Sequence, residues 1–320
     1  MAGFENHIGF TISGSKLQLV EVIYKDRQFI LDKIDEAYFN EPVNMETDKE
    51  TKIDSLLQGA FNEILIKKPL KSSFASFALP FELFHIMQVP YDNTLLHQDL
   101  VEEFKWELSV LYPYISVKDI VLQYIEVEKN NLITQNTMIA VAVQRKFLQM
   151  IYNFCRANNL KLKFIDNIHM ASERALAANY PSSAKGLTMS IYITNKFLSL
   201  IYSLDGKLIY FKVIPLNDAG EIPSLLLNEI TQVDSFPVGE WKARERFHRI
   251  DKNSIDNAFI SGEEISENMI RALSDTLGID LIFFNPFEKI KPDSELFTNK
   301  FYLEKNNSFS PAAGIAYRLA

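Results

Sequence analysis

Hydrophobic and polar residues alternate over much of the first forty positions of the chain, and this period of two predicts consecutive β-strands. Ile8, Phe10 and Ile12 place their apolar side chains on one face of the first strand. Farther along, apolar residues recur at the spacing of a helix face, which predicts an amphipathic helix. The elements expected in this part are strands over 8–12, 17–23, 28–39 and 74–79 and a helix over 50–66.

The same order, three strands followed by a helix and a strand, is predicted a second time. The stretches 8–22 and 190–202 each indicate a strand, a tight polar turn and a strand. They superpose at a constant offset of 181 residues, which places Thr11 on Tyr192 and Leu19 on Leu200. Two related lobes are therefore expected. The later elements are strands over 187–214 with a hairpin turn at Asp205-Gly206, a helix over 222–236, a strand over 258–261, a helix over 266–277, a strand over 281–284, a loop over 287–308 and a closing helix over 311–320.

Residues 83–164 predict a small αβ unit that is inserted into the first lobe. A strand over 161–165 leads back to that lobe, and Asp166 is expected to cap the helix that follows. The elements expected in the inserted unit are strands over 83–89, 120–128 and 137–143 and helices over 93–112 and 145–158. The chain then divides into a first lobe of 1–82, 165–186 and 308–320, the inserted unit of 83–164, and a second lobe of 187–307.

Composition excludes several classes of function. The net charge is −8, whereas a nucleic-acid surface needs a positive field along the phosphates. The basic cluster over 241–249 is interrupted by Glu245 and is interpreted as a solvated surface. Cys155 is the only cysteine, so no intrachain disulfide exists and a reducing compartment fits. There is no leader pattern and no apolar run near the roughly 18 residues of a membrane span, so we expect a cytoplasmic protein.

Side chains suited to catalysis are sparse. There are 11 glycines in 320 residues, against an average usage of about 7%, although a backbone that wraps around phosphates favours glycine. The five histidines show no metal spacing, and no Ser-His-Asp or G-x-S-x-G pattern occurs. Glu102, Glu103 and Glu107 lie on one expected helix and are interpreted as solvated surface acids. We therefore expect no metal site and no catalytic residue.

Short motifs spaced along nearly the whole chain carry a family resemblance. They are Leu79-Pro80 with Val89-Pro90, Glu107 to Tyr114, Gln123-Tyr124, Ala140 to Val143, Asn159-Leu160 with Ile165-Asp166, Ala171 to Ala175, Ser261-Gly262 and Ala313 to Ala316. In this order the chain resembles the PilM family of actin-like proteins in type IV pilus assembly and, more distantly, the FtsA division proteins. The resemblance implies an α/β, actin-like (ribonuclease H-like, duplicated) two-lobed fold. It also implies a small αβ subdomain inserted in the first lobe and a reduced small subdomain, about 216–256, in the second.

The resemblance locates two phosphate loops that hold ATP in the family, and this chain departs from both. The family has Asp-x-Gly in each loop and a Lys farther along the first. Thr11, Ser13 and Gln18 replace the three residues of the first loop. Tyr192 and Thr194 replace the two of the second. With the reduced Gly-Gly pair near the adenosine, the degenerate cofactor-binding positions are Thr11, Ser13, Gly14, Ser15, Tyr192, Thr194, Asn195, Ser261 and Gly262.

Because both acids of these loops are replaced, the chain lacks the carboxylates that anchor Mg²⁺ and orient water in the family. Phosphoryl transfer depends almost wholly on such positioning. Thr11 offers an uncharged hydroxyl, and Tyr192 is expected to project a neutral ring where a carboxylate would sit. The turn over 13–15 still allows weak ATP binding through its N–H groups. We therefore expect a pseudo-ATPase without a resident cofactor rather than an enzyme.

The leading functional hypothesis is a non-catalytic scaffold. As the resemblance implies, PilM proteins hold a short cytoplasmic segment of a membrane-anchored partner in a groove beside the inserted unit. Phe84, Ile86 and Gln88 are the expected contacts for an extended peptide of a bitopic membrane protein. The protein would then lie in the cytoplasm, peripherally at the inner face of the membrane, in a pilus- or secretion-type envelope assembly. It would bind no nucleic acid and would not insert into the membrane itself.

Two alternatives stay open at this stage. One is a divergent actin-like ATPase that binds and slowly hydrolyses ATP, which a titration with MgATP distinguishes from a scaffold. The other is an offshoot of the same fold that is unrelated to pili, which the neighbouring genes would indicate.

Overall fold

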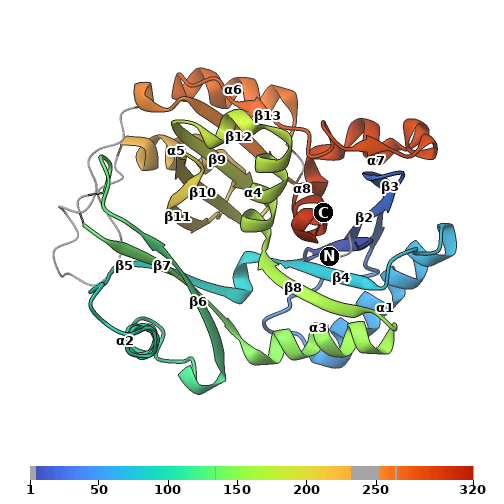
Figure 1. The fold of residues 1–320 in the computed structure, drawn as a ribbon, viewed down its shortest axis with the longest axis horizontal. Coiled ribbons are helices and arrows are strands. Elements are labelled where there is room, and N and C mark those ends of the chain that lie inside the picture. Colours follow the sequence, from blue (N-terminus) through green and yellow to red (C-terminus); the bar gives the residue numbers. More distant parts are fainter. Residues whose placement is uncertain (1–4, 134, 232–251, 264, 320) are drawn as a thin grey trace. The chain divides into compact units, whose positions relative to one another are not determined.

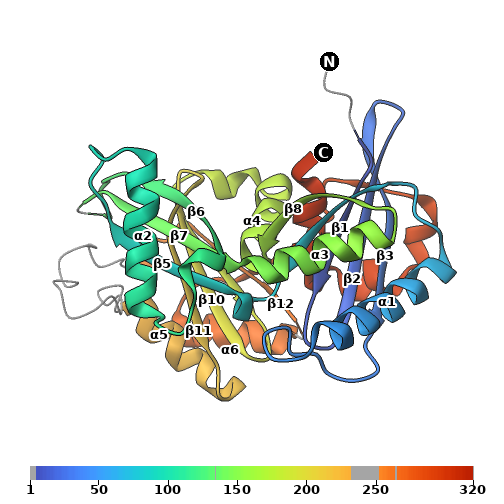
Figure 2. The ribbon, with the colours of Figure 1, turned by 90° about the horizontal axis from the view of Figure 1, so that it is seen from below.

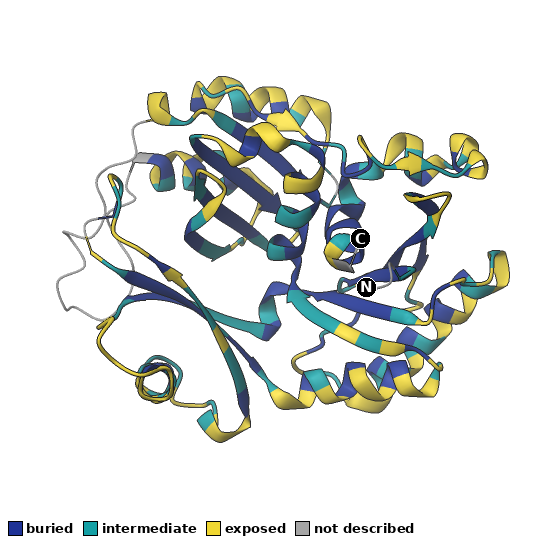
Figure 3. Ribbon diagram, viewed as in Figure 1, coloured by how far each residue is buried: buried dark blue, intermediate teal, exposed yellow. Residues whose placement is uncertain are grey.

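Figure 1 shows the fold in the computed structural model, which describes residues 5–133, 135–231, 252–263 and 265–319. The chain separates into two compact units, each formed by segments that are far apart in the sequence. Strand residues are mostly buried, whereas exposed positions gather on the outer sides of helices and in turns (Figure 3). Unit 1 comprises Met1–Leu83, Phe147–Pro181 and Phe283–Ala320, and unit 2 comprises Phe84–Lys146 and Ser182–Ile282.

Unit 1 is built on a six-stranded mixed sheet with the strand order β14-β3-β2-β1-β4-β8. β1, β2 and β3 form an antiparallel meander, and β4 and β8 continue the sheet in parallel beside β1. The strands are β1 His7–Ile12, β2 Lys16–Lys25, β3 Gln28–Tyr38, β4 Phe74–Leu79, β8 Lys161–Asn167 and β14 Lys291–Pro292. The helices are α1 Glu50–Lys67, α3 Arg145–Ala157, α4 Ile168–Asn179, α7 Lys300–Glu304 and α8 Ser310–Ala316.

Helices cover both faces of this sheet. On one face, where Figure 2 shows α1 and α3, the Phe61 ring of α1 lies 5.9 Å from Phe10, which in turn stacks on Phe77 at 4.7 Å. On the other face α8 lies against β1 at Gly9. A Cβ atom at Gly9 would lie 1.9 Å from the Ala312 carbonyl oxygen. Only glycine allows α8 to approach the sheet this closely.

Unit 2 contains a five-stranded sheet with the order β11-β10-β9-β12-β13, which repeats the order β3-β2-β1-β4-β8 of unit 1. β9, β10 and β11 are antiparallel, and β12 runs parallel to β9. The strands are β9 Leu187–Ile193, β10 Phe197–Leu204, β11 Lys207–Pro215, β12 Asn257–Gly262 and β13 Ile282–Phe283, and the helices are α5 Ile222–Thr231 and α6 Glu267–Leu277.

The two antiparallel meanders agree in register at the predicted offset of 181 residues. The first strand pair of each meander aligns equivalent residues, and each second pair shifts its register at the equivalent point. The prediction of two related lobes is therefore confirmed at the level of single strand pairs. The equivalent positions are the pairs Thr11–Gln18 and Tyr192–Ser199 and the register shifts at Glu21/Val22 and Tyr202/Ser203.

A second, three-stranded antiparallel sheet in unit 2 has the order β5-β7-β6 and is covered on one face by one helix, α2 (Figure 2). Leu100, Phe104 and Leu108 of α2 pack on the residues of the sheet that point toward the helix. Because strand side chains alternate, the residues between them point to the opposite face. The elements are β5 Phe84–Pro90, α2 His97–Leu111, β6 Ile120–Val127 and β7 Thr137–Gln144.

The range predicted for the inserted unit, 83–164, is divided between the two compact units. β8 pairs in parallel with β4, so it belongs to the sheet of unit 1. α3 packs on the same unit through Phe154, whose ring centroid lies 5.5 Å from that of Phe61 and 6.0 Å from that of Phe77. These contacts bury the apolar side of α3 within unit 1, to which most of its residues belong. Of the predicted range, only 84–146 belongs to unit 2.

Asp166 does not cap α4, as the sequence predicts, and the prediction is wrong by one residue. The cap is Asn167, whose side-chain oxygen accepts a 2.9 Å hydrogen bond from the His169 N–H. Asp166 instead accepts a 2.7 Å bond from Arg174 and lies 3.4 Å from Arg318. Two guanidinium groups orient the Asp166 carboxylate, and the neutral amide of Asn167 takes the cap.

Part of the predicted organisation lies outside the described residues. This applies to the basic cluster over 241–249, to the end of the helix expected over 222–236 and to much of the reduced subdomain at about 216–256. Within the described ranges, no helix combines the length and the apolar character needed to cross a membrane.

Candidate functional site

The turn that joins β1 to β2 in unit 1 holds the first candidate phosphate loop. The Ser13 N–H donates to the Lys16 carbonyl at 3.0 Å, and the Ser15 N–H lies 3.4 Å from the Ser13 hydroxyl oxygen. The carbonyl of Gly14 accepts a 2.8 Å bond from the Val43 N–H, which ties the turn to the segment after β3. Two N–H groups of this turn, those of Ser13 and Ser15, therefore already donate to oxygen atoms of the turn.

The turn that joins β9 to β10 in unit 2 repeats this construction. The Thr194 N–H donates to the Phe197 carbonyl at 2.9 Å, which is the equivalent of the Ser13 bond. The Thr194 hydroxyl oxygen accepts bonds from the N–H groups of Lys196 at 3.2 Å and Phe197 at 2.9 Å. Asn195 is exposed at the tip. A Thr side chain thus fills the turn and takes up N–H groups that a phosphate would need.

The two positions that carry acids in the PilM family are occupied by buried neutral side chains. Thr11 is buried in β1, and its hydroxyl has no hydrogen-bond partner among the residues that the structure describes. Tyr192 is buried in β9, and burial, with the charge of Glu263 as a smaller cause, raises its pKa well above the ordinary value. Tyr192 is therefore a neutral core residue of the unit 2 sheet rather than a ring projecting from it.

The Ser261-Gly262 pair ends β12 beside the end of β9. Gly262 has a φ of 149°, and a Cβ atom there would lie 2.1 Å from the Ile193 carbonyl oxygen. Ser261 is fully buried. The close approach of two parallel strands therefore requires glycine at 262, independently of any nucleotide.

Gln18, which replaces the Lys of the family, belongs to a buried polar cluster in unit 1. Its amide nitrogen donates to Glu36 at 3.1 Å and to the Ser308 hydroxyl at 3.3 Å. Lys16 lies 2.9 Å from the same Glu36 carboxylate. Burial alone raises the pKa of Glu36, but the hydrogen bond and charge of Lys16, the Gln18 bond and Lys305 bring the net pKa below its ordinary value. Gln18 therefore stabilises an ionised Glu36.

The residues of the two turns do not fit Mg²⁺ with ATP. The metal needs oxygen ligands with negative charge, and Thr11 and Tyr192 supply none. Among the described residues, no group of three or more His, Cys, Asp or Glu side chains is arranged to hold a metal ion. The turn amides whose bonds are given above point to oxygens of their own turns.

The second candidate site is the face of the β5-β7-β6 sheet opposite α2, which we call the open sheet face. Phe84 and Ile86, both expected from the sequence, point to it from β5 and are half-buried. Val121, Ile125 and Val141 extend the same face over β6 and β7, and they too are half-buried. These three were missed by the sequence analysis, although the period-two pattern of both strands signals them. The open sheet face is therefore mostly apolar. Gln123 is exposed on it, Ile139 and Val143 are buried, and the half-buried side chains form its accessible part.

Gln88 points to the same face but has a different role. It is buried, and its amide nitrogen donates to the Thr137 hydroxyl and to the Ile209 carbonyl, both at 2.9 Å. These bonds tie β5 to β7 and to β11 within unit 2. A partner could reach this amide only by displacing those bonds, so Gln88 supports the open sheet face rather than forming part of its accessible surface.

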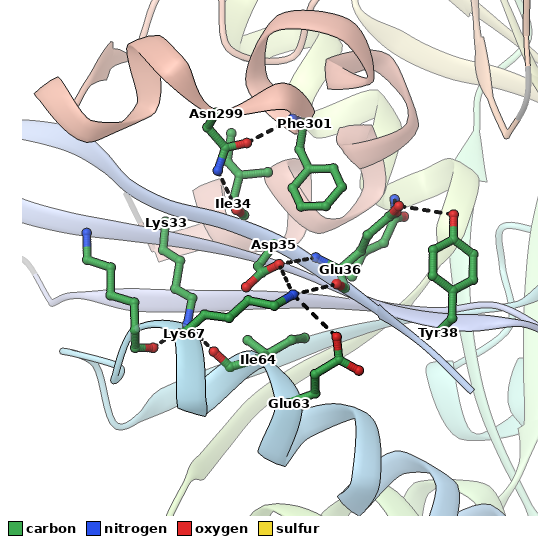
Figure 4. A network of polar contacts seen from close by, with 12 residues as sticks. Lys33, Ile34, Asp35, Glu36, Tyr38, Glu63, Ile64, Lys67, Asn299 and Phe301 are labelled. Atoms are coloured by element: carbon green, nitrogen blue, oxygen red, sulfur yellow. Dashed lines mark hydrogen bonds and ion pairs between the residues drawn. The ribbon is translucent and has the colours of Figure 1, made fainter. Parts of the chain in front are cut away.

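A third candidate is a cavity of about 480 Å³ in unit 1, along the outer edge of β3. Figure 4 shows polar contacts among some of the residues that line it. Four of its charged residues form ion pairs: Lys67 lies 3.0 Å from Asp35, and Lys68 lies 2.9 Å from Glu295. The Lys33 ammonium donates to the carbonyls of Ile64 and Lys68 at the end of α1, and burial lowers its pKa. The run Asp32-Lys33-Ile34-Asp35-Glu36 interrupts an apolar strand pattern and is the sequence signal for this network.

Comparison with known proteins identifies the fold. No protein-family model matches the chain, and no curated protein is similar to it in sequence. A chain of the PilM–PilN type IV pilus biogenesis complex superposes with a TM-score of 0.69 and 18% identity, covering 99% of both chains. The expected actin-like, two-lobed α/β fold is thereby confirmed, and in its fold the chain is PilM-like.

Weaker similarities extend to other proteins. One is a protein of unknown function with an actin-like ATPase fold from Bacteroides thetaiotaomicron VPI-5482, with a TM-score of 0.48, 11% identity and coverage of 88% of this chain and 94% of that one. Another is the cytoplasmic domain of EpsL, an inner membrane component of the type II secretion system of Vibrio cholerae, with a TM-score of 0.40, 11% identity and coverage of 88% and 98%.

Proposed function

We propose that this protein is a non-catalytic actin-like scaffold that binds a short cytoplasmic segment of a membrane-anchored partner in a pilus- or secretion-type envelope assembly. The observation that carries the proposal is the open sheet face, where Phe84, Ile86 and Val141 leave apolar surface half-buried. The full-length likeness to a chain of the PilM–PilN complex supports it. The protein would lie at the inner face of the cytoplasmic membrane, held there by its partner.

An extended peptide suits this surface because its side chains alternate. Apolar side chains at every second position of a peptide can contact Phe84, Ile86 and the apolar residues of β6 and β7. Such a peptide would lie across the face of the sheet rather than along the outer edge of β6, because β7 separates β6 from β5.

The absence of ATP hydrolysis belongs to the same proposal. Two observations support it. Thr11 and Tyr192 are neutral and supply no charged oxygen ligand for a divalent cation, and the turns after β1 and β9 use their N–H groups in hydrogen bonds within the turn. Binding of the partner would then depend on the sheet alone and would need no nucleotide.

The test uses synthetic peptides copied from the cytoplasmic segments of bitopic membrane proteins encoded beside this gene. One of them is expected to bind, measured by calorimetry, without nucleotide. Phe84→Ser combined with Ile86→Ser should weaken it about tenfold or more, since the apolar contacts carry the binding energy. Ile66→Ser, at a highly exposed position on α1, is the matched control and should leave affinity unchanged. If no such peptide binds, or if the double variant binds as well as the parent, the proposal fails.

A further inference from the structure

The outer side of α2 carries large apolar side chains where an amphipathic helix should be polar. Its inner side, through Leu100, Phe104 and Leu108, already fills the core of the β5-β7-β6 sheet. On the outer side, Trp106 is 66% exposed and Val110 is 61% exposed. Tyr114, just after the helix, is 75% exposed. The inner face fills the core, so packing among the described residues of this unit does not require the outer stripe to be apolar.

Acidic residues share this outer side with the apolar ones. Asp99, Glu103, Trp106 and Val110 follow one another at intervals of four, three and four residues, which places them on one side of the helix. Glu102 lies beside them and pairs with Lys105 at 2.7 Å on the exposed surface. The stripe is therefore apolar toward the end of α2 and acidic toward its start.

This charge pattern selects among the surfaces that could cover the stripe. In an antiparallel pairing with a second copy, Asp99, Glu102 and Glu103 would lie against the apolar end of the other stripe and lose water without gaining a cation. In a parallel pairing they would lie close to the same acids, which repel one another. A membrane surface with anionic lipids is disfavoured for the same reason. A helix with apolar side chains flanked by lysine or arginine complements both the apolar and the acidic part.

We propose that the outer side of α2 is a docking site for a basic amphipathic helix of another protein, with Trp106 as its main anchor. Tryptophan is the residue type most enriched among side chains that dominate binding at interfaces. The site differs from the open sheet face of the proposed function, because α2 covers the other face of that sheet. The protein would then have two partner surfaces on one small subdomain.

The experiment uses fluorescence from Trp106 itself. The chain has two tryptophans, so Trp241→Phe, at a position outside the described residues, makes Trp106 the only reporter. The probe is a synthetic amphipathic helix of about five turns with leucine on one side and lysine beside it. On addition of the probe, the Trp106 emission should shift to shorter wavelength as water is excluded. Affinity, measured with a labelled probe by anisotropy, should fall as salt rises.

Variants separate the two contributions. Trp106→Ala and Val110→Ser should each lower the affinity for the probe, the former about tenfold. Glu102→Lys combined with Glu103→Lys should lower it by a similar factor. Ile66→Ala on α1 removes an apolar side chain that is even more exposed, at 86%, and should leave the affinity for the probe unchanged. All of these side chains are exposed, so folding should be retained, and urea midpoints verify it. The double variant Phe84→Ser with Ile86→Ser should bind the probe with unchanged affinity, and this separates the test from that of the proposed function.

Several results would overturn the inference. A control peptide with the same lysines but glutamine for leucine should bind poorly, and equal binding would mean charge attraction alone. Self-association that Trp106→Ala abolishes, seen by light scattering, would assign the stripe to a second copy. Trp106-dependent binding to phosphatidylserine vesicles would assign it to a membrane. An unshifted emission spectrum at saturating probe would also reject it.

Discussion

Single residues decide what the two turns can bind. At Thr11 and Tyr192 the chain places neutral side chains inside its sheets, and at Ser13 and Thr194 it places hydroxyl groups that accept bonds from turn N–H groups. A carboxylate at either buried position would need a cation or several donors to offset its desolvation. The neutral residues avoid that cost, so the turns contribute to folding whether or not a nucleotide is present.

The first prediction concerns MgATP. Calorimetric titration is expected to show no binding at sub-millimolar affinity, because the described turns offer no carboxylate for the metal. Gly14→Ala should fold with a small shift of the Val43 backbone, since a Cβ atom there would make one tight contact, 3.3 Å from the Val43 carbonyl oxygen. Sub-millimolar affinity that is lost in Gly14→Ala or Thr11→Val would contradict the prediction and favour the divergent ATPase.

The second prediction is a loss of stability on mild acidification. Burial, with a smaller contribution from the charge of Lys163, lowers the pKa of His7 to about 4, and burial lowers the pKa of His169 to about 3. Below the ordinary value of 6.5 the unfolded chain takes up these protons while the folded chain does not. Stability is therefore complete above about pH 6.5 and falls as pH drops toward 4, by about 3 kcal/mol from His7 alone at about 1.4 kcal/mol per pH unit.

Urea denaturation at several pH values between 7 and 4.5 measures this slope. His7→Gln retains a polar group near the Ser76 hydroxyl, which lies 2.9 Å from the His7 ring, and should flatten the slope. An equal slope in His7→Gln and the parent would show that His7 does not titrate as proposed.

At the scale of elements, β3 shows how an edge strand is protected. β14 pairs only with its start, at Ile30 and Leu31. Beyond that point three carbonyls of β3 accept side-chain donors instead of a strand, and Figure 4 shows the bonds to Ile34 and Glu36. Such capping keeps an exposed edge from pairing with another chain. The three bonds are from Lys68 to Asp32 at 3.1 Å, from Asn299 to Ile34 at 3.3 Å and from Lys67 to Glu36 at 3.4 Å.

The third prediction follows from these caps. Asn299→Asp combined with Lys67→Met removes two donors from the β3 edge, while Asp at 299 can still cap the start of α7. We expect an unfolding free energy lower by about 1–2 kcal/mol and concentration-dependent association, because the freed carbonyls can accept bonds from another strand. Urea denaturation and light scattering measure the two effects. Lys300→Ala in the same cavity is the control, and association at the level of this control would reject the prediction.

The sequence predicted the long elements well and the short ones poorly. The meanders were predictable because apolar side chains alternate along β1, β2, β9 and β10, and the turn at Asp205-Gly206 adopts the positive φ values that such a pair favours. β14 and α7 were missed within the expected loop over 287–308, because elements of two and five residues depend on tertiary contacts. Asp166 and Asn167 are both good caps, and the pairing of Asp166 with Arg174 and Arg318 depends on tertiary structure that the local sequence does not contain.

The candidate sites were predictable to different degrees. The replacement of both loop acids is readable from the sequence, as is the apolar face at Phe84 and Ile86. The burial of Gln88 was not, because it depends on the Ile209 carbonyl of β11, a strand more than a hundred residues away. The exposed stripe with Trp106 was not predicted either. The residues around Trp106 predict an amphipathic helix, but the hydrophobic pattern alone does not say which side of that helix packs on the sheet.

At the scale of the whole molecule, duplication and insertion serve different ends. The two large sheets repeat one topology in the same register, and their helices and strands are occupied by core packing. The inserted β5-β7-β6 sheet with α2 is not repeated among the described elements, and it carries the open sheet face and the outer stripe of α2. The candidate surfaces on the β5-β7-β6 sheet and α2 thus lie outside the two meanders, whose registers agree.

The last prediction asks whether these two surfaces act separately. Phe84→Ser with Ile86→Ser should weaken the partner peptide about tenfold or more and leave the leucine–lysine helix within about twofold, and Trp106→Ala should do the reverse. The reason is geometric: side chains of the open sheet face and the outer side of α2 are separated by the sheet and by the core around Phe104. Titrating each ligand in the presence of the other measures any coupling, which must be equal in both directions. A variant that keeps its urea midpoint but loses both ligands would show that the thin sheet transmits binding from one face to the other.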